Sequence, residues 1–222
     1  MKYIKTTLLA LLASLATSPL FAADLAGGYI GVQASVNGVE LDGDHNDSQG
    51  NVTTGTIGKF AVIGGAELGY VYPMSDVFLL DIGLNVASGN AKITSASTNN
   101  TDVSFEVADL MTFYIAPTVA LSEGSSVYLK AGYAAADAKA VGNVSKPDNL
   151  SGTVMAIGTR TVLPNGFFIR TEAGMMDFDQ IKVKGLTAPV GGQGEQSGIS
   201  NTTTVTADPK VAYGSLSLGY KF

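Results

Sequence analysis

The chain has 222 residues, of which 45% are hydrophobic and only 14% charged, and its formal net charge is −6. It contains no Cys and no Trp, and its one His is His45. The absence of Cys excludes a disulfide-stapled secreted scaffold and a thiolate metal site. The acidic balance gives no sign of the clustered basic surface that nucleic-acid binding needs.

The N-terminus has the layout of a cleavable secretory signal. Lys2 and Lys5 precede the apolar run LLALLASLATSPLF, and the small residues Ala22 and Ala23 follow it. The run is shorter than the roughly 20 residues that a spanning helix needs. We therefore predict a Sec-type signal peptide over residues 1–22, cleaved after Ala22 or, as the alternative, after Ala23. The remainder, residues 23–222, suits a single domain with 11 basic and 19 acidic residues.

Eight segments of this domain alternate apolar and polar residues with a period of two, which is typical of β-strands. They cover residues 28–36, 60–72, 77–86, 110–121, 127–136, 153–163, 167–175 and 213–222. Two residues fit this pattern poorly. Asp109 interrupts the apolar face of the fourth segment, and Pro117, which cannot donate a ladder hydrogen bond, should lie near a strand end or a bulge.

The connections between the segments alternate in length. PMSD, SEGSS and LPNG are tight, whereas residues 38–59, 88–104, 137–151 and 177–209 form long polar stretches. A soluble sandwich has no reason to sort its loops in this way, but an outer-membrane barrel has short periplasmic turns and long extracellular loops. The sequence thus predicts an all-β fold, a single eight-stranded antiparallel transmembrane up-and-down barrel with four long extracellular loops.

The charges within the segments all lie on the face opposite the aliphatic residues. They comprise three acids and three bases: Glu67, Asp81, Lys130, Arg160, Arg170 and Glu172. In a barrel of about eight strands this face points into an interior that side chains just fill. Because an unpaired buried charge costs several kcal/mol, we predict an ion-paired lumen, in which the abundant glycines leave room for the long Lys and Arg side chains.

The chain ends in YGSLSLGYKF, an alternating stretch that stops on an aromatic residue. In a closed barrel the last strand pairs with the first, so the chain can end at the periplasmic interface with Tyr220 and Phe222 in an aromatic girdle. Together with GGYIGVQAS, GGAELGY, VYLKAGYAAAD and FIRTEAG, this stretch resembles the eight-stranded family that includes the OmpA transmembrane domain, OmpX and the Opa-type surface proteins.

The resemblance covers essentially the whole domain and carries several expectations. It implies a Gram-negative outer-membrane location among lipid and lipopolysaccharide. It implies that Leu218, Tyr220 and Phe222 form the C-terminal signal read by the barrel-assembly machinery, with periplasmic chaperones helping during biogenesis. It also implies that Glu67, Lys130, Arg160 and Glu172 occupy inward positions where the family tends to place lumen charges. Unlike the OmpA pattern, this sequence ends at the barrel, which puts a cell-wall tethering role in doubt.

The sequence offers little for catalysis or cofactors. A general base is most often His, and His45 lies in the first predicted loop with no partner on a rigid strand, so we predict no enzyme and no cofactor. Asp42, Asp44 and Asp47 of the same stretch make a weak metal candidate. The Gly and the bidentate Glu of a calcium loop are replaced there by Asp47 and Thr53.

Three functional interpretations remain. The favoured one is a monomeric structural or surface-interaction barrel of the adhesin or opacity type, with a lumen plugged by ion pairs and loops that meet an extracellular ligand. The second is a small porin-like channel whose lumen charges line or gate the pore. The third is a loop-borne enzyme or receptor. The first two differ in whether Lys130, Arg160 and Arg170 are all neutralised across the lumen.

Overall fold

A computed structural model describes residues 22–46, 52–88, 91–94, 104–141, 149–184 and 204–222. These residues form one short helix, α2 (Ala22–Leu25), and the strands β1 (Gly27–Asn46), β2 (Val52–Pro73), β3 (Phe78–Ser88), β4 (Ala91–Thr94), β5 (Ser104–Ala120), β6 (Ser125–Val141), β7 (Leu150–Val162), β8 (Phe167–Phe178), β9 (Ile181–Lys184) and β10 (Thr204–Lys221). No helix in these ranges is long and apolar enough to cross a membrane.

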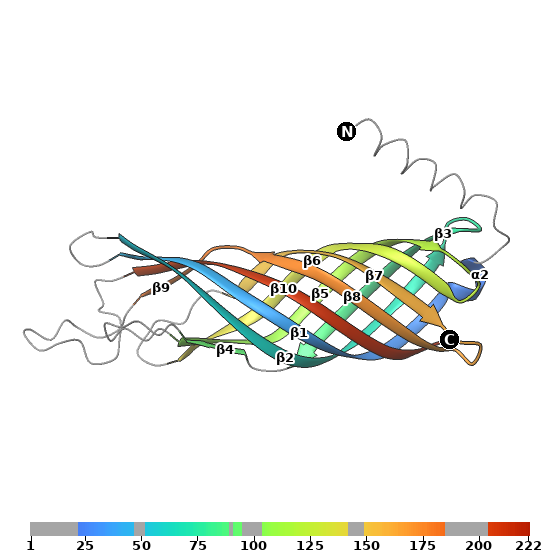
Figure 1. Cartoon of the computed structure of the whole chain (residues 1–222), viewed down its shortest axis with the longest axis horizontal. Coiled ribbons are helices and arrows are strands. Elements are labelled where there is room, and N and C mark those ends of the chain that lie inside the picture. Colours follow the sequence, from blue (N-terminus) through green and yellow to red (C-terminus); the bar gives the residue numbers. More distant parts are fainter. Residues whose placement is uncertain (1–21, 47–51, 89–90, 95–103, 142–148, 185–203) are drawn as a thin grey trace, which may run out of the picture.

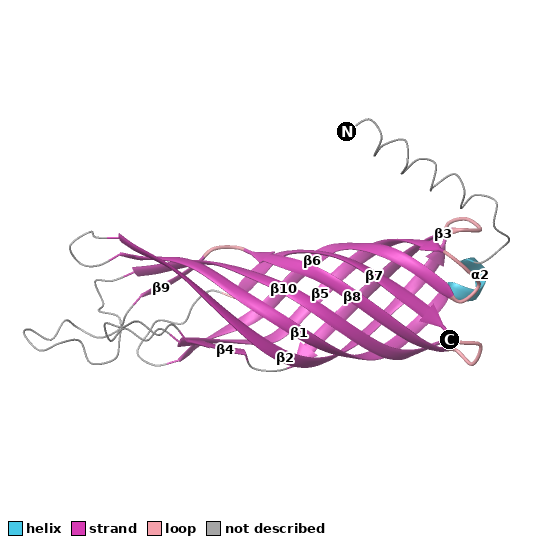
Figure 2. Cartoon of the chain, viewed as in Figure 1, coloured by secondary structure: helices cyan, strands magenta, loops and turns pink. Residues whose placement is uncertain are grey.

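The strands close into a barrel, as predicted. Each long strand pairs antiparallel with its sequence neighbour, and β10 pairs with β1 from Lys221 opposite Tyr29 to Thr204 opposite Asn46. Eight strands make the ring, and the short β4 and β9 are added at one end (Figures 1 and 2). The tight turns after β2, β5 and β7 lie at the other end, beside α2 and the C-terminus. Closure leaves the long strands no free edge.

The two faces of the wall carry the predicted side chains. Aliphatic and aromatic residues point outward and are exposed, Phe60 at 80% and Val62 at 78% being the extremes. The interrupting charges point inward and are buried. A soluble barrel has the opposite arrangement, so this wall is built to contact lipid.

The outward apolar band has the height of a membrane. Counted from the periplasmic turns, the first outward charged residue is Glu40 on β1, Asp109 on β5, Asp137 on β6 and Asp177 on β8, and all four are exposed. On β8 the outward band therefore runs from Phe167 to Met175. A transmembrane β-strand needs about 9–11 residues, which matches this length.

The predicted boundaries of the long loops are wrong in one respect. β1 continues to Asn46 and β2 begins at Val52, so most of residues 38–59 is strand. β6 likewise continues to Val141 and β10 begins at Thr204, while β4 lies within the predicted loop 88–104 and β9 within the predicted loop 177–209. The wall thus extends beyond the apolar band on the extracellular side.

The pairing of β5 with β6 is irregular near the end of the barrel that carries β4 and β9. β5 and β6 shift register between Ala108 and Met111, and Asp109 there has a positive φ of 53°. This is a β-bulge, which places an extra residue in one strand and explains why Asp109 breaks the apolar alternation. Pro117 lies three residues before the end of β5 with its side chain exposed, in line with the expectation that it sits near a strand end.

The interior has an apolar cluster at each end. The larger one, toward β4 and β9, comprises inward residues of β6, β7, β8, β9 and β10, among them Leu150, Val154, Met176, Phe178 and Ile181. The smaller one, at the periplasmic end, packs Leu25 of α2 with Tyr29, Val71, Leu79, Ala120 and Phe168. The sequence analysis predicted charges in the lumen but neither of these clusters. The polar layer lies between them.

Candidate functional site in the barrel lumen

The six predicted charged residues all lie inside the barrel, where each is at most 7% exposed. Glu67 comes from β2, Asp81 from β3, Lys130 from β6 and Arg160 from β7, while β8 supplies both Arg170 and Glu172. Strand alternation explains their common facing, because each stands at an inward position of its strand. Five of the six meet in one network, and Arg160 lies apart from it.

Arg170 is the centre of the network. Its Nη2 lies 3.3 Å from Asp81 Oδ2, and its Nη1 lies 3.5 Å from Glu67 Oε2. Its Nη2 is also 4.0 Å from Glu172 Oε2. One guanidinium therefore faces three carboxylates, a task suited to its planar, five-donor geometry.

Lys130 and Glu172 form the second centre. Lys130 Nζ donates to Glu172 Oε1 at 2.9 Å, and Tyr213 donates to the same oxygen at 2.6 Å. Tyr128 donates to Glu172 Oε2 at 2.8 Å. Both carboxylate oxygens of Glu172 thus have donors, which is what allows this charge to be buried.

Four tyrosines join the charges, and sequence reasoning missed them. Arg170 donates from Nε to the Tyr128 hydroxyl at 2.7 Å and from Nη1 to the Tyr114 and Tyr29 hydroxyls at 2.8 and 3.2 Å. Tyr29 donates to Asp81 Oδ1 at 2.8 Å, so in its 2.6 Å contact with Tyr114 the donor is Tyr114. A relay of hydrogen bonds therefore runs from Arg170 through Tyr114 and Tyr29 to Asp81.

Glycine makes room for these rings, which revises one expectation. A Cβ at Gly69 would lie 2.5 Å from the Tyr29 hydroxyl, and one at Gly83 would collide with the Tyr114 hydroxyl. Gly158 lies in the same way against Tyr128. The inward glycines thus accommodate tyrosines, whereas we expected them to accommodate Lys and Arg. Inward Tyr residues paired with Gly on the adjacent strand were the available signal.

Arg160 is the exception among the bases. No described carboxylate lies within ion-pair distance of its guanidinium, whereas Lys130 and Arg170 both have such partners. Its Cζ lies 4.4 Å from the ring centre of Tyr29 and 4.6 Å from that of Phe168. The predicted ion pairing therefore holds for Lys130 and Arg170 but not for Arg160.

The predicted C-terminal residues face outward at the periplasmic end. Leu218, Tyr220 and Phe222 are all exposed, and the Tyr220 ring meets Phe167 edge-on at 5.4 Å. The amide of Phe222 donates to the Gly28 carbonyl at 2.9 Å, closing the ring of strands up to the last residue. Their role as an assembly signal stays a prediction.

The metal candidate is not in a loop. Asp42 and Asp44 lie within β1, where they are paired in register with Asp208 and Thr206 of β10, and Asp47 falls outside the described residues. The described residues contain no group of three or more side chains suited to hold a metal ion. The loop placement was wrong because β1 extends through the polar stretch. His45 is also in β1.

Fold and site together define a transmembrane β-barrel with an inward-facing ionic layer and a lipid-facing apolar wall. The chain belongs to the family of the outer membrane protein beta-barrel domain, whose model matches residues 7–222. Its location is accordingly the outer membrane of a Gram-negative bacterium. No curated protein matches the chain.

Solved structures of outer-membrane barrels resemble the chain, and one of them shares its fold. The outer membrane protein OprG from Pseudomonas aeruginosa is 15% identical with a TM-score of 0.55, and the match covers 89% of this chain and 97% of that one. The outer membrane protein AlkL in DMPC lipid bilayers is 16% identical with a TM-score of 0.49, covering 88% and 91%. Ail of Yersinia pestis, an attachment invasion locus protein, is 14% identical with a TM-score of 0.42, covering 86% and 98%. At 15% identity the likeness to OprG shows the fold alone.

Proposed function

We propose that this protein is a closed outer-membrane barrel whose role is structural or lies in surface interaction, and that its lumen does not conduct. Its activity would then reside in the strand extensions and loops on the extracellular side. The observation that carries the proposal is the ionic layer centred on Arg170, whose buried side chains join seven of the eight barrel strands, all except β7.

Two further features support a closed lumen. The apolar clusters lie on either side of the ionic layer, so a hydrated ion would have to cross both apolar and hydrogen-bonded regions. Moving an ion through such a constriction is costly, because apolar constrictions dewet and five of the six buried charges already have ion-pair partners. Nothing in the ionic layer combines a nucleophile with a positioned His, and we propose no enzymatic activity.

The proposal includes the route of biogenesis. Residues 1–22 would be removed as a signal peptide by cleavage after Ala22 or Ala23, and residues 23–222 would form the mature barrel. Assembly would depend on the barrel-assembly machinery and periplasmic chaperones, and the monomer would reside among outer-membrane lipid and lipopolysaccharide. An extracellular ligand would bind through the loops.

A narrow pore is the second candidate, and one observation favours it. Among the described residues, buried Arg160 has no ion-pair partner, and Glu67 Oε1 has no hydrogen-bond partner. A lumen whose charges are not all satisfied has unused polar groups that a passing ion could contact. Rearrangement of Arg170 between Glu67 and Asp81 would then act as a gate.

Single-channel conductance of the refolded mature protein in a planar bilayer tests the two candidates. The sample must be fully folded, as judged by heat modifiability, and is compared with Glu172→Gln and with the matched control Glu40→Gln, whose carboxylate is outside the lumen. We expect no stable conductance from the wild type. Reproducible openings that Glu172→Gln alters and Glu40→Gln does not would overturn the closed barrel and establish the pore.

A further inference from the structure

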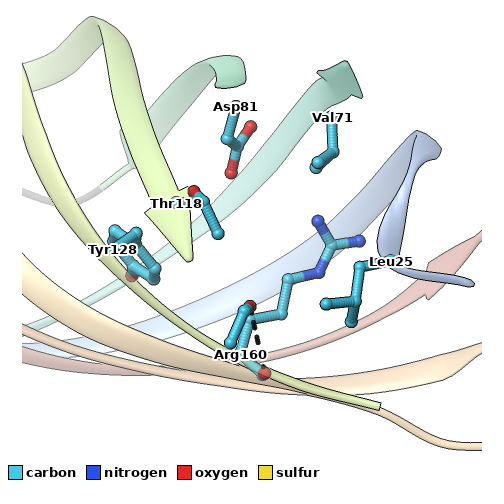
Figure 3. A pocket seen from close by; sticks show the side chains of 7 residues that line it. Leu25, Val71, Asp81, Thr118, Tyr128 and Arg160 are labelled. Carbon is cyan, nitrogen blue, oxygen red and sulfur yellow. Dashed lines mark hydrogen bonds between the residues drawn. The ribbon is translucent and has the colours of Figure 1, made fainter. Parts of the chain in front are cut away.

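The periplasmic end of the lumen holds a small cavity next to the ionic layer. It is lined by Leu25, Val71, Asp81, Thr118, Ser126, Tyr128 and Arg160 (Figure 3). Its free space is sufficient for roughly one water-sized ligand. From this cavity we propose that Arg160 binds a small inorganic anion of the size of chloride.

The Arg160 guanidinium lies against two aromatic rings. Its Cζ lies over the rings of Tyr29 and Phe168, which themselves pack edge to face with centroids 5.6 Å apart. Arg160 is 4% exposed, so the cation is held in place by aromatic rings in a nearly dry site. Because the two ring planes are nearly perpendicular, at 86°, the planar guanidinium can stack flat on only one of them.

The edge of the guanidinium is unused. Within the part of the chain that the structure describes, Nε, Nη1 and Nη2 of Arg160 are buried and have no hydrogen-bond partner. In Figure 3 the guanidinium points into the space beside Val71 and Leu25. Leaving a buried charged donor unsatisfied costs more than leaving a neutral one, so a ligand that accepts these hydrogen bonds stabilises the site.

The acceptors nearby are already engaged. Asp81 is the one carboxylate that lines the cavity, and its oxygens face the Tyr29 hydroxyl at 2.8 Å and Arg170 Nη2 at 3.3 Å. Tyr128 donates to Glu172, Thr118 donates to the Ala116 carbonyl at 2.9 Å, and Ser126 donates to the Arg160 carbonyl at 3.4 Å. Among the described residues the cavity therefore offers unused donors from Arg160, and Asp81, which shares Arg170 with two other carboxylates, does not come within ion-pair distance of them. Unused donors on a buried cation favour an anion.

The size and the enclosure of the cavity limit which anions can bind. Leu25, which is 2% exposed, closes the cavity from the periplasmic side. The space excludes a phosphate or carboxylate ligand and leaves a monatomic halide. The ion would be enclosed where Leu25 packs with Tyr29, Val71 and Phe168 at the end of the barrel.

The first test is diffraction from crystals of the mature protein grown with bromide replacing chloride. We expect an anomalous peak within hydrogen-bond distance of the Arg160 nitrogens. A site that holds only ordered water, with no anomalous signal, would overturn the proposal. This arm uses the wild type and does not depend on any variant folding.

The second test measures unfolding by urea in lipid vesicles as chloride replaces gluconate at constant ionic strength. A ligand that binds only the folded state stabilises it in proportion to its occupancy. We expect the midpoint of the wild type and of Lys210→Gln, which removes an exposed cation, to rise with chloride. Arg160→Gln should lose this dependence. An equal chloride dependence in Arg160→Gln, or none in the wild type, would contradict the proposal.

Discussion

At the scale of single residues, the lumen is organised by large polar rings lying over glycines. Tyr29, Tyr114 and Tyr128 each place a hydroxyl beside Arg170, and each reaches across a neighbouring strand at a glycine. The glycine is needed because any Cβ there would occupy the volume of the ring. Packing of this kind resists added methyl groups, since the ring cannot shift without breaking its hydrogen bonds.

Replacing Gly83 by Ala tests this arrangement. Its Cβ would collide with the Tyr114 hydroxyl and lie 2.8 Å from the Tyr29 hydroxyl, so we expect a loss of about 1–3 kcal/mol in the free energy of unfolding. The matched control is Gly64→Ala, whose Cβ would meet nothing within 4 Å on the outward face. Urea unfolding in lipid vesicles compares the two. Equal midpoints for the two variants would show that the tyrosines can move freely.

The sequence predicted the charges of the lumen better than its tyrosines. A charged residue on the inward face of a strand is easy to recognise as a site residue, because a buried charge needs a partner. A Tyr at an inward position gives no such signal, since Tyr also occurs in the outward girdle, as Tyr70 and Tyr72 do here. The isolation of Arg160 could not be predicted either, because partners across the lumen depend on strand register.

At the scale of the strands, the β5 bulge lies at a residue that interrupts the apolar alternation of the sequence. Asp109 was expected to disturb the fourth segment, and it occupies the left-handed region at φ 53°. Asp is among the few residues besides Gly that adopt this conformation readily, whereas a β-branched residue is strained there.

Two variants of Asp109 separate the backbone effect from the charge. Asp109→Val should cost about 1–2 kcal/mol because it forces a β-branched residue into the left-handed conformation. Asp109→Gly also removes the carboxylate but relieves the conformation, so its unfolding midpoint in urea should match or exceed that of the wild type. If Asp109→Gly were destabilised as much as Asp109→Val, the charge and not the bulge would be responsible.

The strands also explain why the loop boundaries were predicted poorly. The apolar alternation that reveals a strand exists only where one face meets lipid, as between Phe167 and Met175 on β8. Beyond the band the outward face of β1 becomes polar at Glu40, while Val39 packs inward against the larger apolar cluster, so the pattern of the lipid-facing part does not continue. The eight segments were therefore identified by their membrane-embedded parts, and the extensions to Asn46 and from Val52 were not.

The lipid-facing band predicts a dependence of stability on depth. On β3 the outward residues run from Phe78 at the turn through Leu80, Ile82 and Leu84 to Val86, so Ile82 is central. Ile82→Arg should cost about 2–4 kcal/mol, and Leu80→Arg, nearer the interface, should cost less. Urea midpoints of both variants in lipid vesicles give the comparison. Equal costs would contradict the placement of the band along β3.

At the scale of the whole molecule, closure and export meet at the C-terminus. The last residue completes the ring, since the amide of Phe222 donates to Gly28 and its side chain lies over that glycine. The same residue ends the stretch that resembles the recognition signal for barrel assembly. Phe222 thus has a structural contact and a proposed biological role, and one deletion can tell them apart.

Deleting Phe222 should strongly lower the amount of protein assembled in the outer membrane. It should lower the free energy of unfolding only slightly. The deletion removes one backbone hydrogen bond and an exposed ring, a loss of about 0.5–1.5 kcal/mol for the hydrogen bond. The pairing of β1 with β10 from Tyr29 to Asn46 remains. We therefore expect the purified variant to refold into lipid vesicles with nearly the wild-type urea midpoint.

In cells the same variant should accumulate in the periplasm, where the heat-modifiable folded form measures how much has assembled. Phe222→Tyr keeps a terminal aromatic ring and is the matched control, which should assemble at the wild-type level. Normal assembly of the deletion variant would mean that Phe222 is no assembly signal. Failure to refold in vitro would instead mean that its contact with Gly28 is needed to close the barrel.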